Sequence, residues 1–152
     1  MASLNVQSWK QVVTIAASDA IFSLPVNQTA LESTERKLNL SLPFHLREIL
    51  LECGSVTADC SSGVIWSISD ILVRNLEFRS MDAFRELYMP FNHLLFFGDD
   101  GGGDQFAFPI HADGKIHKPD IYRWEHETDS RSWFASDRKQ YFERRFKNDF
   151  DT

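Results

Sequence analysis

Apolar side chains recur every three or four residues along the first part of the chain, which is the spacing of a helix with one buried face. Residues 6–20 are therefore expected to form an amphipathic helix on the apolar positions Val6, Trp9, Val12, Val13, Ala16, Ala17 and Ala20. A second helix is expected from Thr29 to about Leu38, because Thr29 and Glu32 have the spacing of a capping box. Its buried positions are Leu31, Thr34 and Leu38.

The next segments alternate between helical and extended patterns. Leu42-Pro43 is expected to open a third helix, since proline is tolerated in the first helical turn, and Gly54 to end it. The buried face of this helix consists of Leu46, Ile49, Leu50 and Cys53. Residues 64–68 are β-branched and aromatic and predict a strand, residues 69–72 a turn or short helix, and residues 81–89 another helix. Phe84, Leu87 and Tyr88 are expected inside this last helix's buried face.

The strongest local pattern is a pair of apolar, aromatic runs at 93–97 and 105–110, joined by the glycine-rich segment 98–104. Such a pair predicts a β-hairpin. A turn over 112–115 should then lead to another strand at 121–124. Beyond it, Ser136 is expected to cap a final helix. Tyr141, Phe142 and Phe146 should face inward on that helix, and Arg138, Lys139, Arg144, Arg145 and Lys147 should face solvent.

The order of these elements predicts an α+β fold with N-terminal helices, a mostly antiparallel central sheet and a C-terminal helix. The chain has 152 residues, of which 43% are hydrophobic and 25% are charged, so residues 1–152 are expected to form one domain with its own core. No apolar run is long enough to cross a membrane, and Trp9, Lys10 and Gln11 interrupt any signal-like stretch. A cytoplasmic location without membrane contact is therefore expected. Cys53 and Cys60 match neither a zinc spacing nor a secreted disulfide scaffold, so reduced thiols are expected.

Negative charge is concentrated in the second half of the chain. The formal net charge is −6, and residues 99–129 contain eight acidic against three basic side chains. Nucleic-acid binding relies on clustered lysine and arginine, so nucleic acid is not expected as a direct ligand. The acidic segment suits a basic protein partner, and it is equally compatible with a surface that only keeps the protein in solution.

The DDGGGD segment at 99–104 invites a phosphate or a calcium interpretation. A phosphate loop would need a lysine followed by serine or threonine before a helix, whereas here carboxylates flank the glycines and a strand follows. A calcium loop beginning at Asp99 would need a glutamate at the twelfth position, which is Ile110. The remaining interpretations are a tight hairpin that uses glycine for positive φ angles and a recognition loop.

Other candidate sites also lack the spacing that their chemistry requires. His111 and His117 flank a turn and have no third ligand at metal spacing, so solvated side chains are expected. Strand alternation would place His126 on the face opposite to Glu125 and Glu127, which argues against an acid/base set. Cys53 is expected to be a buried, inert thiol. No metal site, cofactor or enzymatic activity is therefore expected.

Three segments in this order resemble one known family. They are the helix with Leu42-Pro43, Leu46, Ile49-Leu50 and Cys53-Gly54, the hairpin 94–104, and the strand 121–127. The chain is similar over residues 27–147 to the SMI1/KNR4 (SUKH) family, whose pattern combines an "LP…L…G" helix, a "gddggGd" hairpin and a "w.he" strand. One departure is Cys53-Gly54, where the family usually has Asn-Gly, so the end of the helix is loosely specified.

This resemblance implies an α+β domain used for protein recognition. Bacterial members commonly act as antidotes to toxins, including nucleases, whereas fungal members regulate the cell wall and carry long disordered arms that this sequence lacks. The resemblance thus favours an immunity protein that occludes a cognate, basic toxin, with a regulatory or scaffold protein as the alternative. The partner-binding side chains expected are Asp99, Asp100, Asp104, Glu125, Glu127 and Trp133. For Trp133, a position in the core or at the entry of the last helix remains the alternative to a surface role.

Overall fold

The computed structural model describes residues 7–58 and 62–146 of the chain. Within these residues the helices are α1 (Trp9–Ala16), α2 (Gln28–Leu38), α3 (Phe44–Cys53), α4 (Ile68–Ser80), α5 (Asp82–Leu87) and α6 (Arg138–Phe146). The strands are β1 (Ile21–Phe22), β2 (Val56–Ala58), β3 (Ser62–Ile65), β4 (Leu94–Asp99), β5 (Gln105–Pro109), β6 (Ile121–Glu125) and β7 (Ser130–Ala135). This order confirms the α+β class and the C-terminal helix.

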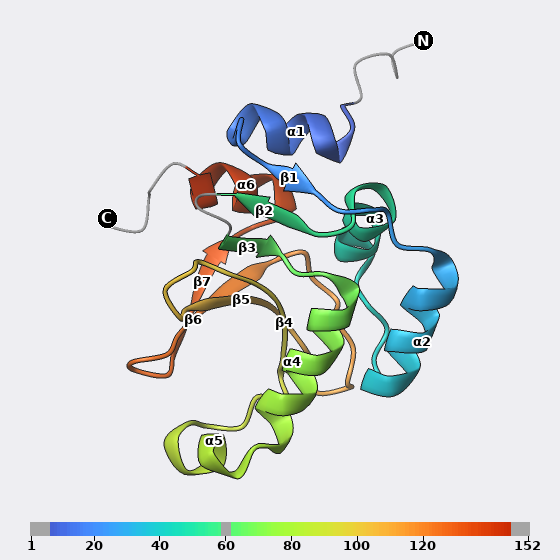
Figure 1. Ribbon diagram of the computed structural model, residues 1–152. Coiled ribbons are helices and arrows are strands. Elements are labelled where there is room, and N and C mark those ends of the chain that lie inside the picture. The colour runs from blue at the N-terminus through green and yellow to red at the C-terminus, as the bar shows by residue number, and fades with distance from the viewer. Residues whose placement is uncertain (1–6, 59–61, 147–152) are drawn as a thin grey trace.

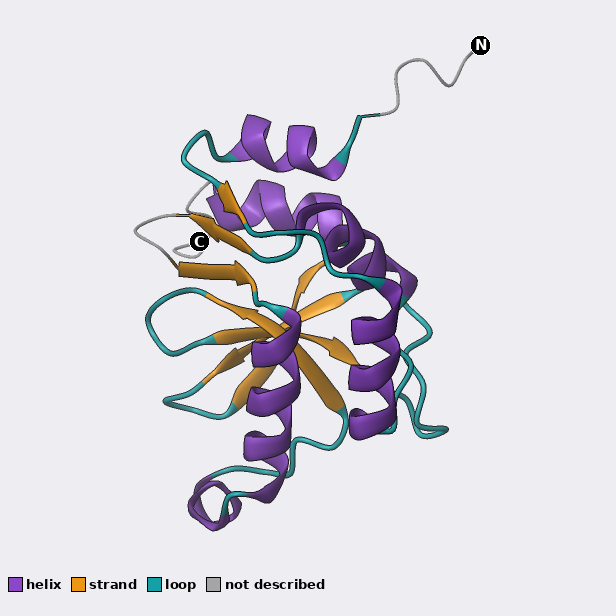
Figure 2. Cartoon of the chain, turned by 45° about the vertical axis from the view of Figure 1, so that its right-hand side comes forward, coloured by secondary structure: helices purple, strands orange, loops and turns teal. Residues whose placement is uncertain are grey.

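The strands form two antiparallel sheets, one with the order β1-β2-β3 and one with the order β4-β5-β6-β7. The sheets meet where the Trp66 amide, just after β3, donates a 2.8 Å hydrogen bond to the Phe97 carbonyl of β4. Gly98 allows this approach, because a Cβ there would lie 2.3 Å from the Val64 carbonyl oxygen. In Figures 1 and 2 the helices α2 and α4 lie side by side along the sheets, and α1 lies beside α6 at the opposite end from α5.

The first helix is shorter than the periodicity indicates. Ser8 caps it at Trp9 by accepting a hydrogen bond from the Gln11 amide, while the Gln11 side chain accepts one from the Ser8 amide. The helix ends at Ala16, and Ile21 and Phe22 pair with β2 instead of extending the helix. The expected helix over 6–20 is therefore wrong at its C-terminal end, and its first residue lies outside the described residues.

The next two helices match the expected registers with small shifts at their N-termini. Asn27, and not Thr29, caps α2, because its side chain accepts a 2.8 Å hydrogen bond from the Ala30 amide. Pro43 is the cap of α3 and not its first residue. Gly54 ends α3 with a φ of 66°. The buried faces of both helices agree with the pattern: Leu31, Thr34, Leu38, Leu46, Ile49, Leu50 and Cys53.

The region after β3 differs most from expectation. Residues 69–72, expected as a turn or short helix, belong to the 13-residue helix α4, which Ser67 caps by accepting a hydrogen bond from the Asp70 amide. The helix α5 is shorter than the expected 81–89, and Leu87 on it is 69% exposed instead of buried. Residues 130–135, which show no clear periodicity, form β7 because β6 supplies their hydrogen-bonding partners.

The core is rich in aromatic side chains on both faces of the second sheet. On the α4 side, Phe78, Phe91, Phe96 and Trp124 pack with ring centroids 5.0–5.8 Å apart. On the α6 side, the Tyr141 hydroxyl donates a 2.7 Å hydrogen bond to the Val64 carbonyl, and burial raises its pKa. This packing fixes the hairpin end of the sheet between two layers of helices.

Two titratable side chains in the core bear on the expectations. Arg145 is buried, not solvated, because its Nη2 donates hydrogen bonds to Ser62 Oγ at 2.6 Å and to the Asp99 carbonyl at 3.3 Å. Cys53 is a buried free thiol, and burial, with Glu52 beside it, raises its pKa to about 11. Cys60 lies outside the described residues. None of the described helices is long and apolar enough to span a membrane.

Candidate functional site

The connection between β4 and β5 is a loop whose own carboxylates hold its backbone. Asp99 Oδ1 accepts a 2.8 Å hydrogen bond from the Gly101 amide, and Asp100 Oδ1 accepts one of the same length from the Gly102 amide. Gly101 and Gly103 have φ angles of 84° and 110°, which glycine adopts without steric cost. The hairpin prediction is thus confirmed, with the connection running over residues 100–104.

Asp99 also joins the loop to the first sheet and to α4. Its Oδ2 accepts a 2.6 Å hydrogen bond from Trp66 Nε1 and lies 3.6 Å from the Arg74 guanidinium. The Arg74 guanidinium in turn stacks over the Trp66 ring at 4.5 Å. With a side chain only 17% exposed, Asp99 serves mainly as a junction between β4, α4 and the residues after β3.

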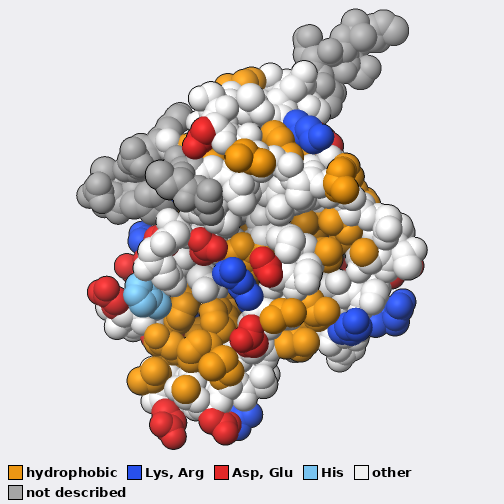
Figure 3. All heavy atoms as spheres, viewed as in Figure 1, with side chains coloured by type: hydrophobic (Ala, Val, Ile, Leu, Met, Phe, Trp, Pro, Cys, Tyr) orange, Lys and Arg blue, Asp and Glu red, His pale blue; other side chains and the backbone are white. Residues whose placement is uncertain are grey.

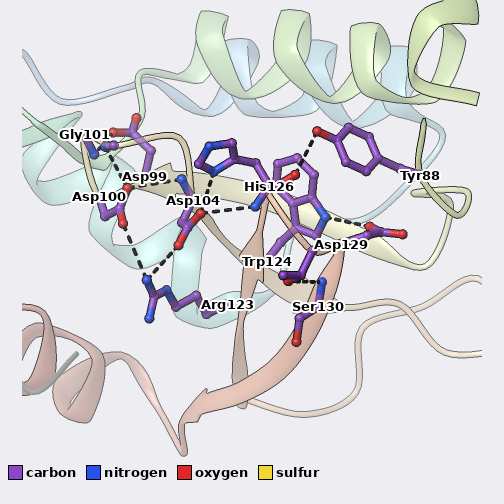
Figure 4. Close-up of polar contacts among 12 residues, drawn as sticks. Tyr88, Asp99, Asp100, Gly101, Asp104, Arg123, Trp124, His126, Asp129 and Ser130 are labelled. Atoms are coloured by element: carbon purple, nitrogen blue, oxygen red, sulfur yellow. Dashed lines mark hydrogen bonds and ion pairs between the residues drawn. The ribbon is translucent and has the colours of Figure 1, made fainter. Parts of the chain in front are cut away.

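Asp104 occupies the corresponding position at the other end of the loop. Its Oδ2 accepts a 2.7 Å hydrogen bond from Arg123 Nη2, and its Oδ1 contacts both the amide and the ring Nδ1 of His126. Burial alone would raise the pKa of Asp104, but the hydrogen bonds from His126 and Arg123 outweigh burial and lower it. Figure 4 shows this carboxylate between Arg123 and His126, with Asp100 reaching the same guanidinium at 3.9 Å.

The turn between β6 and β7 is held by a third carboxylate. Asp129 Oδ1 accepts hydrogen bonds from Trp124 Nε1 at 2.8 Å and from Arg131 Nη2 at 2.9 Å, while its Oδ2 accepts one from the Met89 amide at 2.8 Å. The Tyr88 hydroxyl donates to the His126 carbonyl at 3.0 Å, as Figure 4 also shows. The turn is therefore bonded to the loop through His126 and to the segment after α5 through Tyr88 and Met89.

The structure brings together most of the acidic residues that the sequence singles out, and it divides them into two groups. Asp99, Asp100 and Asp104 are largely shielded, with exposed side-chain fractions of 17%, 19% and 13%, and they have internal partners. Glu125 is half-buried at the end of β6, and Glu127 is exposed in the turn. Of these five carboxylates only that of Glu127 is exposed, so it is the most accessible negative charge at this end of the sheet.

Trp133 lies apart from this group. It pairs with Tyr122 in the sheet, and its Nε1 donates a 2.8 Å hydrogen bond to Asp120 at the opposite end of β6 from Glu125. The ring is 45% exposed, with the Arg144 guanidinium 5.1 Å from its centre. Trp133 therefore lies at the surface and not in the core.

A cleft of about 520 Å³ opens beside Asp99, between the two sheets and the N-terminal end of α4. Its lining is mostly polar and comprises Ser55, Thr57, Ser62, Gly63, Ile65, Trp66, Ser67, Asp70, Arg74, Asp99, Asp100 and Gly101. The lining holds three carboxylates, those of Asp70, Asp99 and Asp100, against one guanidinium, that of Arg74, so the cleft is polar and carries an excess of negative charge.

The histidines form a separate pair on another loop. His117 Nε2 lies 2.6 Å from Asp113, and the rings of His111 and His117 are 5.1 Å apart. His117 is exposed, whereas His111 is half-buried. The expectation of two solvated side chains therefore holds for His117 and not for His111. The described residues contain no group of three or more histidine, cysteine, aspartate or glutamate side chains placed to hold a metal ion.

The sequence analysis did not identify the basic and aromatic partners of residues 99–104, which we call the acidic loop. Arg123 and His126 stand two and five residues beyond the start of a predicted strand. They are too far from Asp104 in the chain for a helical or strand period to indicate that the three side chains are in contact. Arg74 lies in the part of α4 that extends beyond the turn or short helix expected over residues 69–72. Strand pairing, which sets Gln105 opposite Trp124, is the relation that places Arg123 and His126 beside the loop.

Comparison with models of protein families relates this chain to known proteins. A family model, SUKH_6, described as SMI1-KNR4 cell-wall, matches residues 28–142. The match runs from α2 into α6 and includes the acidic loop, the turn after β6 and all of α4 and α5. No curated protein sequence matches the chain.

Proposed function

Because the chain belongs to the SMI1-KNR4 cell-wall (SUKH) family, we propose that it is a non-enzymatic protein-binding domain that neutralises a cognate bacterial toxin by occluding it. The observation that carries the proposal is the acidic hairpin end, where loop 100–104 and the β6–β7 turn are fixed to each other through Asp104 and His126. A surface held in one conformation loses little entropy on binding, which suits tight recognition.

Inhibition would be steric and electrostatic, with no chemical step. An interface of about 1,600 Å² in total suffices for a stable complex, and toxin–immunity pairs are among the tightest complexes known. Glu125 and Glu127 would steer a basic toxin toward the hairpin end, whereas Asp99, Asp100 and Asp104 would shape the loop and add to its negative field. The site of action would be the cytoplasm of the cell that has to be protected.

A regulatory or scaffold role is the second candidate, and the description of the matched family as cell-wall favours it. Such a protein would bind its partner without rescuing cells from a toxin. The two roles therefore make opposite predictions in a protection assay, although both involve protein binding.

The immunity role predicts that the neighbouring gene encodes a large secreted protein with a toxin domain at its C-terminus, and the experiment co-expresses that domain with the chain. The toxin domain alone should stop growth, and co-expression of the wild-type chain should restore it. A fold-disrupting variant with Gly54→Val, in which the new Cβ would lie 2.3 Å from the Leu24 carbonyl oxygen, should not restore growth. Growth arrest in the presence of the wild-type chain would remove the immunity role and leave the regulatory one.

A further inference from the structure

The stretch from the start of α4 to Met89 exposes several large hydrophobic side chains. Large hydrophobic side chains in this stretch are 40–69% exposed, and they are Val73, Leu76, Met81, Leu87 and Met89. We call this set the α4–α5 face. In Figure 1, α5 projects from the body of the molecule beyond the end of α4, and Figure 3 shows hydrophobic side chains gathered at that end. None of the residues of α5 is buried, so this helix contributes little to the core.

A pocket of about 440 Å³ adjoins the α4–α5 face. Its lining consists of Phe78, Arg79, Phe84, Arg85, Tyr88, Met89, Pro90, Phe91 and Asn92. The rings of Phe78 and Phe84 lie 5.1 Å apart, and that of Tyr88 lies 5.8 Å from Phe84. Aromatic walls lined also by Arg79 and Arg85 suit an apolar side chain better than a lysine or arginine, because like charges repel.

The α4–α5 face is held in place although it projects. Arg131 donates hydrogen bonds to the carbonyl oxygens of Met89 at 2.7 Å and of Pro90 at 2.8 Å. The Met89 amide and the Tyr88 hydroxyl are bonded to the β6–β7 turn, as described above. The face is therefore continuous with the acidic hairpin end and shares its fixed geometry.

Charge decides which kind of partner fits. Exposed carboxylates surround the apolar side chains, namely Glu77, Asp82 and Glu86 on the helices and Glu127 on the adjoining turn. Arg85 lies 3.4 Å from Asp82 and so neutralises only part of this charge. A second copy of the chain would set these carboxylates against their equivalents, whereas a partner with basic groups around an apolar centre would pair with them.

We propose that the α4–α5 face and its pocket form the contact centre for a basic partner protein, which inserts one apolar side chain between Phe84, Tyr88 and Met89. The identity of that partner as the toxin rests on the proposed function. Contact centres of interfaces are apolar and surrounded by polar residues, and a few anchors dominate their affinity. The hairpin end then attracts the partner, and the α4–α5 face retains it.

The test replaces two exposed anchors together, Leu87→Ser and Met89→Ser, which are 69% and 67% exposed. The bonds that fix the segment are made by the Met89 backbone, so the thermal unfolding midpoint should stay at the wild-type value. The matched control is Leu24→Ser with Ile15→Ser, whose side chains are 86% and 73% exposed away from this face. Dissociation of the complex with the toxin domain should accelerate at least tenfold in the first variant and remain unchanged in the control.

The outcomes separate this inference from the proposed function. Protection by the wild-type chain together with equal dissociation rates for wild type and the Leu87/Met89 variant would overturn the α4–α5 face and keep the immunity role. A complex that forms without protection would overturn the immunity role, and the same kinetics on that partner would still decide the contact centre. Analytical ultracentrifugation completes the design, because a concentration-dependent dimer that the variant abolishes would assign the face to a second copy and overturn the inference.

Discussion

Asp104 and His126 are joined twice, since Asp104 Oδ1 contacts both the His126 amide at 3.1 Å and the His126 ring Nδ1 at 2.7 Å. The two residues stand 22 positions apart in the chain, and their contact closes the hairpin loop onto the turn after β6. The loop accommodates three aspartates in a short segment because each carboxylate accepts hydrogen bonds from backbone or side-chain donors of its own.

Replacing Asp104 by Asn should destabilise the protein by about 1–3 kcal/mol at pH 7, since the charged bonds to Arg123 and His126 are weakened. The folded-state pKa of Asp104 is lowered, so its stabilising contribution is present above the unfolded pKa and is lost as pH falls through the folded value. The difference between wild type and variant should therefore shrink below about pH 4. Urea unfolding between pH 7 and pH 3 measures it, and Glu127→Gln is the exposed control. A pH-independent difference would contradict the pKa shift.

Strain in the loop should appear at Gly103 and not at Gly102. Gly103 has a φ of 110°, and an added Cβ would lie 2.7 Å from the His126 ring, whereas one at Gly102 would only touch Asp100 Oδ1 at 3.6 Å. The sequence pattern alone does not tell which glycine of the loop has positive φ, and the structure assigns it to Gly101 and Gly103. Gly103→Ala should cost about 1–3 kcal/mol in unfolding free energy, and Gly102→Ala should stay within about 0.5 kcal/mol of wild type. Similar losses at both positions would refute this assignment.

Electrostatic steering should depend on the half-buried Glu125 and the exposed Glu127. Glu125→Gln with Glu127→Gln should lower the association rate with a basic toxin roughly two- to tenfold at low salt, with a smaller effect on dissociation. The loss should diminish as added salt shortens the Debye length to about 10 Å or less. Surface-binding kinetics over a salt series measures it, with Glu32→Gln and Glu143→Gln as a control that removes two charges elsewhere. Equal association rates in both double variants would exclude local steering.

Removal of metal should leave the protein unchanged. The carboxylates of the acidic loop already accept hydrogen bonds from amides, Trp66 and Arg123, and the described residues contain no metal-binding cluster. Urea unfolding with and without a chelator should give the same midpoint, and metal analysis of the purified protein should find less than one equivalent. A chelator-induced loss of stability would return the histidine pair and the acidic loop to consideration as ligands.

Sequence alone determined the elements whose cause is local. Periodicity located the buried faces of α2 and α3, and Gly54 marked a helix end because glycine accepts its positive φ. The paired apolar runs located the β4–β5 hairpin, because the glycines between them accept the positive φ angles of its connection. Three ordered motifs carried the family resemblance, which the match over residues 28–142 confirms.

Tertiary structure decided everything that depends on partners distant in the chain. β7 lacks periodicity and is a strand because β6 lies beside it, and Arg145 is buried because Ser62 and the Asp99 carbonyl accept its hydrogen bonds. The sequence predicts that the aspartates of the loop are accessible charges. In the fold, Asp99 accepts a hydrogen bond from Trp66, and Asp104 contacts Arg123 and His126. The sequence gives the residue type at each position and the local pattern around it. The free energy of a buried charge or of a strand depends also on the groups that pack against it, and only the folded chain brings those groups together.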